Sequence, residues 1–258
     1  MFGWRSKKRE PARTPKGYRA YAIGDVHGRL DLLNGLLSQI EADIARRPSR
    51  RNVLIMLGDL IDRGPDSRGV VERMRTYRHD EIKPYFITGN HEEVLLRILH
   101  RERGILTSWL KFGGSECLRS YGCDPTQLDL KNERAALSAV ARTIPPEHAQ
   151  FLAGFVDSLR FGDYLFVHAG IRPGVDLSLQ TQFDLRWIRS PFLENDVDHG
   201  VVVVHGHTIN PVVEERPNRI GIDTGAYGTG VLTALALEDE SRWILDTSQP
   251  ANIDELAH

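Results

Sequence analysis

Short apolar runs alternate with amphipathic segments over the first hundred residues of the chain. Runs of strand length, rich in Val, Ile and Tyr, predict strands at residues 18–26, 53–57 and 85–88. Between the first two, apolar residues recur every three or four positions from Leu30 to Ile44, which predicts a helix. Similar spacing predicts helices at 70–77 and 94–99. This alternation is typical of parallel β-α-β units with buried central strands.

The pattern changes in the second half of the chain. Residues 106–155 have mostly helical spacing, with breaks at paired Gly and Pro residues. Strands are expected at 164–167, 201–204, 219–222, 231–237 and 243–245, with Asp239-Glu240 as a hairpin turn between the last two. We therefore expect an α/β (layered α+β) fold, in which two packed sheets are flanked by helices, with a helical insertion in the middle.

Charge is unevenly distributed along the 258 residues, which carry 33 basic and 35 acidic side chains and a formal net charge of −2. Residues 1–17 hold six basic residues and one acidic residue, and we expect them to form a disordered arm that could contact an acidic partner. The rest has a net charge of −7, so local cations must attract an anionic substrate, and no specific nucleic-acid binding is expected. We expect one catalytic domain over 18–248 and a fraying tail over 249–258.

Other features favour a cytoplasmic protein. Cys117 and Cys123 match neither a zinc half-site nor a disulfide framework, and we interpret them as free thiols. No apolar run approaches 18 residues, so no membrane span is expected. The charged start of the chain is not followed by the apolar segment of a signal peptide.

Polar side chains that bind metals follow the predicted strands. Asp25 and His27 lie two residues apart, on the same side of an extended segment. In open α/β folds, ligands bind beyond the carboxyl ends of the strands. Nitrogen and oxygen donors without sulfur suit Mn²⁺, which we expect, or Fe or Zn²⁺. The candidate ligands are Asp25, His27, Asp59, Asn90, His168 and His207.

Two divalent ions fit this set if one carboxylate bridges them, and Asp59 is the natural bridge between the two sets of ligands. One ion would bind Asp25, His27 and Asp59. The other ion would bind Asp59, Asn90, His168 and His207. Two divalent ions and two aspartates leave about +2, which attracts a phosphate dianion. Such a pair activates a water molecule and orients phosphoryl oxygens for in-line attack.

Four further residues are candidates for proton transfer and phosphate binding. His91 could protonate the leaving oxygen, with Asp62 orienting it. Arg63 and Arg189 could bind phosphate oxygens with their planar guanidinium groups, and Asn90 is a further candidate for phosphate contact. Each motif alone has an ordinary explanation, such as a turn, a surface pair or a helix N-cap. The ordered set carries the hypothesis.

The segments GDVHG (24–28), GDLIDRG (58–64) and GNHE (89–92) resemble the signature motifs of the phosphoprotein phosphatase family of calcineurin-like metallophosphoesterases. HAG (168–170) and GHT (206–208) resemble its later histidine motifs, and WIR (187–189) resembles the arginine segment of bacterial and phage members. The resemblance covers about residues 18–237. It implies a β-sandwich with flanking helices, a dinuclear metal centre and hydrolysis of phosphomonoesters, with His91 and Asp62 in the proton-donating role.

Three functions remain open. We put first a compact bacterial serine/threonine protein phosphatase, with phosphotyrosine as a further substrate. The alternative is a dinucleoside tetraphosphate hydrolase, although symmetrical members usually have Asp where this chain has Glu92. A non-catalytic binding module would require the loss of a ligand, and none is missing. His205 either supports the site or packs at a strand end, and we interpret Asp223 as a turn residue rather than as a support for a ligand.

Overall fold

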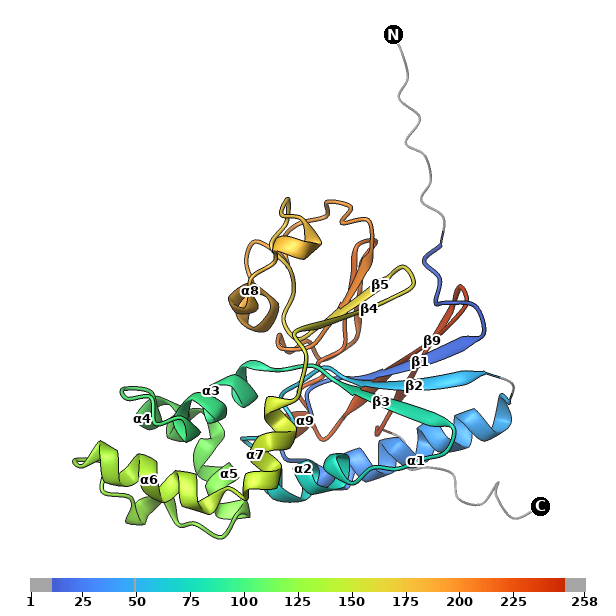
Figure 1. The fold of residues 1–258 in the computed structure, drawn as a ribbon. Helices are drawn as coiled ribbons and strands as arrows, with labels where there is room; N and C mark the ends of the chain where they lie inside the picture. The colour runs from blue at the N-terminus through green and yellow to red at the C-terminus, as the bar shows by residue number, and fades with distance from the viewer. Residues whose placement is uncertain (1–10, 49, 249–258) are drawn as a thin grey trace.

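Two five-stranded sheets lie face to face in a computed structural model that describes residues 11–48 and 50–248 (Figure 1). The first sheet has the strand order β10-β9-β1-β2-β3, and the second has the order β4-β5-β6-β8-β7. Helices cover the outer faces, with α1 running along the first sheet in Figure 1. The predicted layered α/β architecture is therefore confirmed.

The first sheet contains the predicted β-α-β units. Strands β1 (Tyr18–Ile23), β2 (Arg51–Met56) and β3 (Ile82–Phe86) are parallel neighbours, joined through α1 (Leu30–Arg46) and α2 (Ser67–Arg75). β3 begins and ends earlier than its apolar run predicts. The predicted hairpin joins β9 (Thr233–Glu238) to β10 (Ser241–Asp246), and β9 pairs antiparallel with β1.

The second sheet is built on three parallel strands, β5 (Tyr164–Val167), β6 (Val202–His205) and β8 (Arg219–Gly221). Two edge strands were not predicted, namely β4 (Ser158–Phe161) and β7 (Glu214–Glu215). Both are short and half exposed, so they lack the continuous apolar run that identifies a buried strand.

Alternation along the strands assigns their side chains to separate apolar layers. In β1, Tyr21 and Ile23 pack with the helices, whereas Ala20 and Ala22 pack between the two sheets. β5 repeats this pattern, because Tyr164 and Phe166 face the first sheet and the intervening Leu165 faces the outer helices. Side chains along a strand alternate between the two faces of the sheet, so the apolar pattern determines which face packs against the helices and which packs against the other sheet. A slip of one residue would reverse the two faces, so this pattern also fixes the pairing register of the strands.

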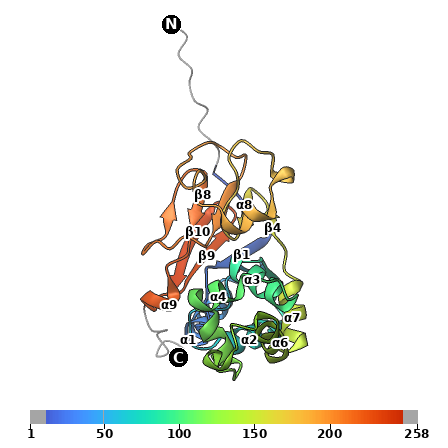
Figure 2. The ribbon, with the colours of Figure 1, turned by 90° about the vertical axis from the view of Figure 1, so that its left-hand side faces the viewer.

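A helical region follows β3 and occupies one end of the molecule. It contains α3 (Asn90–Leu99), α4 (Leu106–Trp109), the π-helical turn η1 (Leu110–Gly114), α5 (Ser115–Ser120), α6 (Glu133–Thr143) and α7 (Pro146–Ala153). Figure 2 views the molecule from this end, with α8 (Gln182–Trp187) above α3 and α4 and with α9 (Ala226–Thr229) to one side. No helix within the described residues is long and apolar enough to cross a membrane.

Residues 11–17 differ from the expected disordered arm. Ala12 is buried, and its carbonyl accepts a hydrogen bond from Tyr164 Oη at 3.2 Å. The backbone of Arg13 bonds to Asp163, and Thr14 bonds to Asp239. This segment is therefore fastened to both sheets. The remaining expectations, disorder over residues 1–10 and fraying over 249–258, lie outside the described residues.

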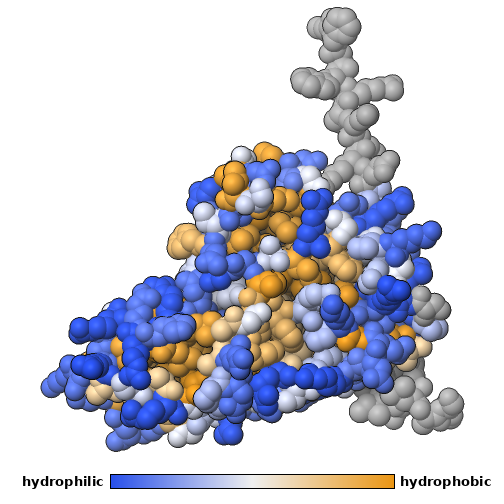
Figure 3. All heavy atoms as spheres, in the orientation of Figure 1, coloured by the Kyte–Doolittle hydropathy of each residue, from blue (hydrophilic) through white to orange (hydrophobic). Residues whose placement is uncertain are grey.

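Figure 3 shows apolar side chains exposed across the middle of one face and over part of its upper region, with hydrophilic side chains around them. Individual large apolar residues with high exposure include Phe112, Leu179 and Phe183. Single exposed apolar residues are normal in proteins, so exposure alone assigns them no role.

Candidate active site

The loops after the parallel strands bring the candidate residues together at one end of the sheets. Asp25 and His27 follow β1, Asp59 follows β2, and Asn90 and His91 begin α3. From the second sheet, His168 follows β5 and His207 follows β6. All seven side chains are buried, although they come from loops far apart in the sequence. The strand-end positions predicted from the sequence therefore do converge in space.

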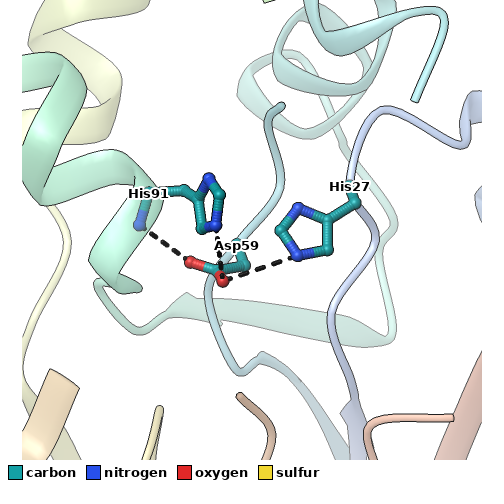
Figure 4. Close-up of side chains that lie close together, drawn as sticks. All are labelled: His27, Asp59 and His91. Carbon is teal, nitrogen blue, oxygen red and sulfur yellow. Dashed lines mark hydrogen bonds and ion pairs between the residues drawn. The ribbon is translucent and has the colours of Figure 1, made fainter. Parts of the chain in front are cut away.

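Asp59 lies at the centre of this cluster. Its Oδ2 atom is 3.6 Å from His27 Nε2 and 3.8 Å from His91 Nε2. Figure 4 draws both contacts as dashed lines. On its other side, Oδ2 is 3.4 Å from His168 Nε2. These separations exceed an ordinary hydrogen bond. Burial opposes ionisation of Asp59, but His168 and His91 outweigh it and lower the pKa of Asp59 well below its usual range, so the group is a carboxylate.

Two groups of three side chains share Asp59 and are compact enough to hold a metal ion. The first is His27, Asp59 and His91, and the second is Asp59, His168 and His207. The Oδ1 atom of Asn90 lies 2.9 Å from both His168 Nε2 and His207 Nδ1, so Asn90 joins the second group. Both groups share Asp59, which we expect to be the bridging residue, but the first group contains His91 in place of the expected Asp25.

The histidines are oriented for metal binding by the backbone behind them. His27 Nδ1 lies 2.8 Å from the Ile61 carbonyl, and His168 Nδ1 lies 2.8 Å from the Leu57 carbonyl. Each contact fixes the ring and turns Nε2 toward Asp59. Burial lowers the pKa of His27 to about 3 and that of His207 to about 2, so both rings are neutral and have a lone pair to offer.

Asp25, which we expect to be a ligand of the first ion, lies beside these groups. Among the described residues, it belongs to neither three-residue group. Its carboxylate instead accepts a hydrogen bond from the backbone of His207, with N–O distances of 3.1 and 3.2 Å. Burial and the neighbouring Asp223 carboxylate raise the pKa of Asp25 well above its usual range. Asp223 is thus buried beside the candidate site, which differs from our interpretation of it as a simple turn residue.

His91 and Asp62 form a buried dyad next to the first group. His91 Nδ1 lies 2.6 Å from Asp62 Oδ2, which also accepts a hydrogen bond from Trp109 Nε1 at 2.8 Å. Burial disfavours the charged imidazole, but Asp59 and Asp62 outweigh it and raise the pKa of His91. Arg63 Nη2 lies 3.1 Å from His91 Nε2. His91 therefore sits between an orienting carboxylate and a guanidinium group.

The site is built from strained backbone. Five candidate residues have left-handed φ angles, which cost side-chain-bearing residues on the order of 1–3 kcal/mol each. Such strain persists only where the surrounding structure determines the conformation, and it concentrates at functional sites. The residues are His27 (φ 45°), Asp59 (49°), Asp62 (72°), Arg63 (66°) and His207 (63°).

Glu92 holds two of the loops together. It is fully buried, and its carboxylate accepts hydrogen bonds of 2.8–2.9 Å from the backbone N–H groups of Asp59, Leu60 and Gly89. A Cβ atom on Gly89 would collide with Asp59 Oδ1, so only glycine permits this close approach. Glu92 therefore sets the position of Asp59 relative to α3.

A cavity of about 460 Å³ opens beside the metal-binding groups. Its lining includes Asn90, His91 and His207, together with Arg63 and the exposed Arg189. The two arginines predicted to bind phosphate thus face the same cavity as the candidate ligands. His205 lies elsewhere: its ring packs against Phe192, with the centroids 5.2 Å apart, and burial lowers its pKa to about 4.

Some residues of the site have no local signal in the sequence. Trp109 bonds to Asp62 across 47 positions, and nothing near either residue indicates the pairing. Phe112 and Trp187 line the same cavity, although they belong to distant segments. Glu92 does have a signal, because a glutamate at the third helical position commonly bonds back to the residues before the helix.

The chain also matches known proteins in sequence and in fold. The model of the calcineurin-like phosphoesterase family matches residues 18–230. The chain belongs to this family and is a metallophosphoesterase, a hydrolase whose His and Asp groups can hold metal ions. The resemblance found in the sequence motifs is thereby confirmed.

Two proteins and one solved structure show what this chain is most usefully compared with. The chain is 28% identical to the asymmetrical bis(5'-nucleosyl)-tetraphosphatase PrpE of Oceanobacillus iheyensis, over 88% of this chain and 92% of that protein. It is 34% identical to serine/threonine-protein phosphatase 1 of Salmonella typhimurium, over 36% of this chain and 38% of that protein. A solved structure provisionally named a diadenosine tetraphosphatase has the same fold, with a TM-score of 0.64, 20% identity and coverage of 91% of this chain and 98% of its own.

Proposed function

We propose that this chain hydrolyses bis(5'-nucleosyl) tetraphosphates with the help of two divalent cations. This is the alternative of our sequence analysis, and the comparisons favour it over a protein phosphatase. The observation that carries it is the alignment with the Oceanobacillus tetraphosphatase, which spans 88% of this chain and 92% of that one. The similarity to the Salmonella protein phosphatase covers 36% of this chain.

The side chains fit a pair of divalent cations. Within the described chain, the Nε2 atoms of His27 and His207 are buried and have no hydrogen-bond partner, and both rings are neutral. We assign His27 and Asp59 to one ion, and Asp59, Asn90, His168 and His207 to the other, with Asp25 next to both sets. When bound, such ions polarise phosphoryl oxygens and make a water molecule nucleophilic near neutral pH. Mn²⁺ suits this set of N and O donors, as do Fe and Zn²⁺.

The dyad supplies the proton that the reaction consumes. As the attacking oxygen bonds to phosphorus, the bridging P–O bond breaks and its electron pair leaves with the nucleotide phosphate. Asp62 fixes the His91 ring through Nδ1, so Nε2 is the atom that can donate to the leaving oxygen. Trp109 holds Asp62 in place, and the short Nδ1–Oδ2 contact stabilises the charged form of His91 before transfer.

Arg63 and Arg189 suit a substrate with several phosphates. Both line the cavity that begins at Asn90 and His91, so they face the side where phosphoryl groups would enter. A guanidinium group binds phosphate oxygens with two parallel hydrogen bonds. A chain of four phosphates carries more charge than one phosphoserine. It can engage both arginines as well as the cations.

A serine/threonine protein phosphatase is the second candidate. It is supported by the 94-residue similarity to the Salmonella phosphatase and by the His91–Asp62 dyad, which would protonate a serine alkoxide. This leaving group is more basic than a nucleotide phosphate and needs the proton more.

A comparison of two substrates tests the proposal. Enzyme loaded with Mn²⁺ is assayed on diadenosine tetraphosphate and on a phosphoserine peptide. We expect kcat/KM to be at least about tenfold higher for the dinucleotide. The products then define the cleavage, because two ADP molecules mean symmetrical attack and ATP with AMP means asymmetrical attack. A preference for the phosphopeptide would instead establish the second candidate.

A further inference from the structure

The cavity extends well beyond the groups that handle phosphate. Beside the buried His91 and Asn90, its lining includes apolar side chains that are less buried, namely Val94, Ile105, Phe112 and Trp187, which we call the outer wall. Arg97 and Ser108 also line the cavity. A volume of about 460 Å³ is within the range of small-molecule binding sites. Hydrolysis of a phosphoryl group does not need this apolar outer wall, so the wall requires a separate explanation.

Trp187 is a fixed aromatic surface. Its Nε1–H donates to Glu93 Oε2 at 3.1 Å, and the same oxygen accepts a bond from Arg186 Nη1 at 3.2 Å. Phe183 lies nearly parallel to the indole, with the centroids 6.5 Å apart and the planes inclined by 15°. Because these contacts already hold the ring, a ligand that stacks on it loses little to ordering the protein.

Phe112 supplies a second aromatic surface and is linked to the phosphate-binding loop. Its side chain is 67% exposed, which is high for an apolar residue that lines a cavity. The next residue, Gly113, accepts a hydrogen bond from Arg63 N at 3.1 Å. This bond sets the position of the aromatic wall relative to Arg63, and hence relative to the phosphates of a bound substrate.

We infer that the outer wall is a nucleoside subsite, in which Phe112 and Trp187 stack against the base of the substrate and make the enzyme selective for nucleotides. This inference rests on the proposed function and names the residues behind its substrate preference. Stacking of a base on an aromatic side chain tolerates any of the common bases. The subsite therefore selects a nucleoside polyphosphate over a phosphopeptide, without selecting strongly among bases.

Binding of two product-like ligands tests the subsite independently of turnover. ADP and methyl diphosphate carry the same phosphates, and only ADP carries a nucleoside. Calorimetry on the Mn²⁺-loaded enzyme should give a Kd for ADP about tenfold lower than that for methyl diphosphate. Equal affinities would overturn the inference. They would leave the proposed function to be decided by the hydrolysis assay, so the two failures can be distinguished.

Substitutions of Phe112 and Trp187 test whether these two side chains cause the preference for ADP over methyl diphosphate. Phe112→Ala and Trp187→Leu should each bind ADP about three- to tenfold more weakly and leave the affinity for methyl diphosphate unchanged. Leu179→Ala is a control for loss of an exposed apolar side chain, because Leu179 is 70% exposed and does not line the cavity. Trp243→Leu is the control for loss of a tryptophan. If Phe112→Ala and Trp187→Leu keep the full preference for ADP, the aromatic wall is not the subsite. If they weaken both ligands equally, their role is structural and the inference fails as well.

Discussion

Two regions meet at the cavity, and they are built in opposite ways. The strand-end loops (24–28, 58–64, 89–92, 168–170 and 206–208) carry buried polar side chains on strained backbone, with Asp59 only 1% exposed. The aromatic wall (Phe112 and Trp187) carries apolar side chains that are partly open to solvent. We interpret the first region as the part that performs the chemistry and the second as the part that selects the substrate.

The difference has a physical basis. Chemistry on a phosphoryl group needs ligand positions held to within a fraction of an ångström, and backbone fastened between two sheets provides that rigidity. Substrate selection needs surface that differs between related enzymes, and an insertion of helices can change without disturbing the sheets. Variants in the two regions should therefore affect different measured quantities.

The largest effect is expected from Asp59→Asn. Because Asp59 belongs to both three-residue groups, its charge would support both of the proposed ions. We expect turnover of p-nitrophenyl phosphate to fall on the order of a thousandfold and metal content per chain to fall as well. Asp43→Asn is a matched control, since Asp43 is also a buried aspartate but bonds to Tyr21 and Arg47 outside the site. Normal metal content together with normal turnover in Asp59→Asn would refute the role of a shared ligand.

His91→Asn should produce the next largest effect and should separate two possible roles. If His91 donates the proton, kcat falls roughly 10²–10⁴-fold on a phosphoserine peptide and the metal content is unchanged. The loss should be smaller on p-nitrophenyl phosphate, because that leaving group is less basic. His91 also lies in the first three-residue group, so a loss of metal would identify it as a ligand instead. His148→Asn removes a buried histidine bonded to Tyr121 and Glu72, and it should change neither quantity.

The strand-end loops were predictable because their signal is local. Each candidate ligand follows an apolar run by one to four residues, and a polar residue in that position lies at the end of a buried strand. The structure brings all of them together. Asp25 shows the limit of this reasoning, because sequence places it beside His27 but does not reveal that its carboxylate faces the backbone of His207.

The aromatic wall could not be predicted in the same way. Phe112 and Trp187 are 75 positions apart, and only the packing of α8 against the α3 region places them around one cavity. The strands likewise divide into those that the local sequence predicts and those that depend on distant neighbours. Long apolar runs identified β1 and β2, whereas the short edge strands β4 and β7 depend on neighbours supplied by tertiary structure. The packing of residues 11–17 against both sheets likewise depends on distant partners.

Gly113→Ala should have the smallest of these effects, and it tests the link between the two regions. Gly113 has φ +115°, and a Cβ atom there would lie 2.5 Å from Arg63 N, so the substitution must displace the Arg63 loop or η1. We expect kcat/KM on diadenosine tetraphosphate to fall about tenfold while metal content is unchanged.

The control for Gly113→Ala is Gly122→Ala, which separates backbone strain from displacement of Arg63. Gly122 also has a positive φ, +82°, but a Cβ atom there would meet nothing within 4 Å. Gly122→Ala should lose about 1 kcal/mol of folding free energy from backbone strain, measured by denaturant unfolding, and Gly113→Ala should lose more, because its Cβ also collides with Arg63. Only Gly113→Ala should also lose kcat/KM, because only its Cβ pushes on a residue that faces the phosphates. Equal kcat/KM values for the two variants would mean that the aromatic wall and the strand-end loops act independently.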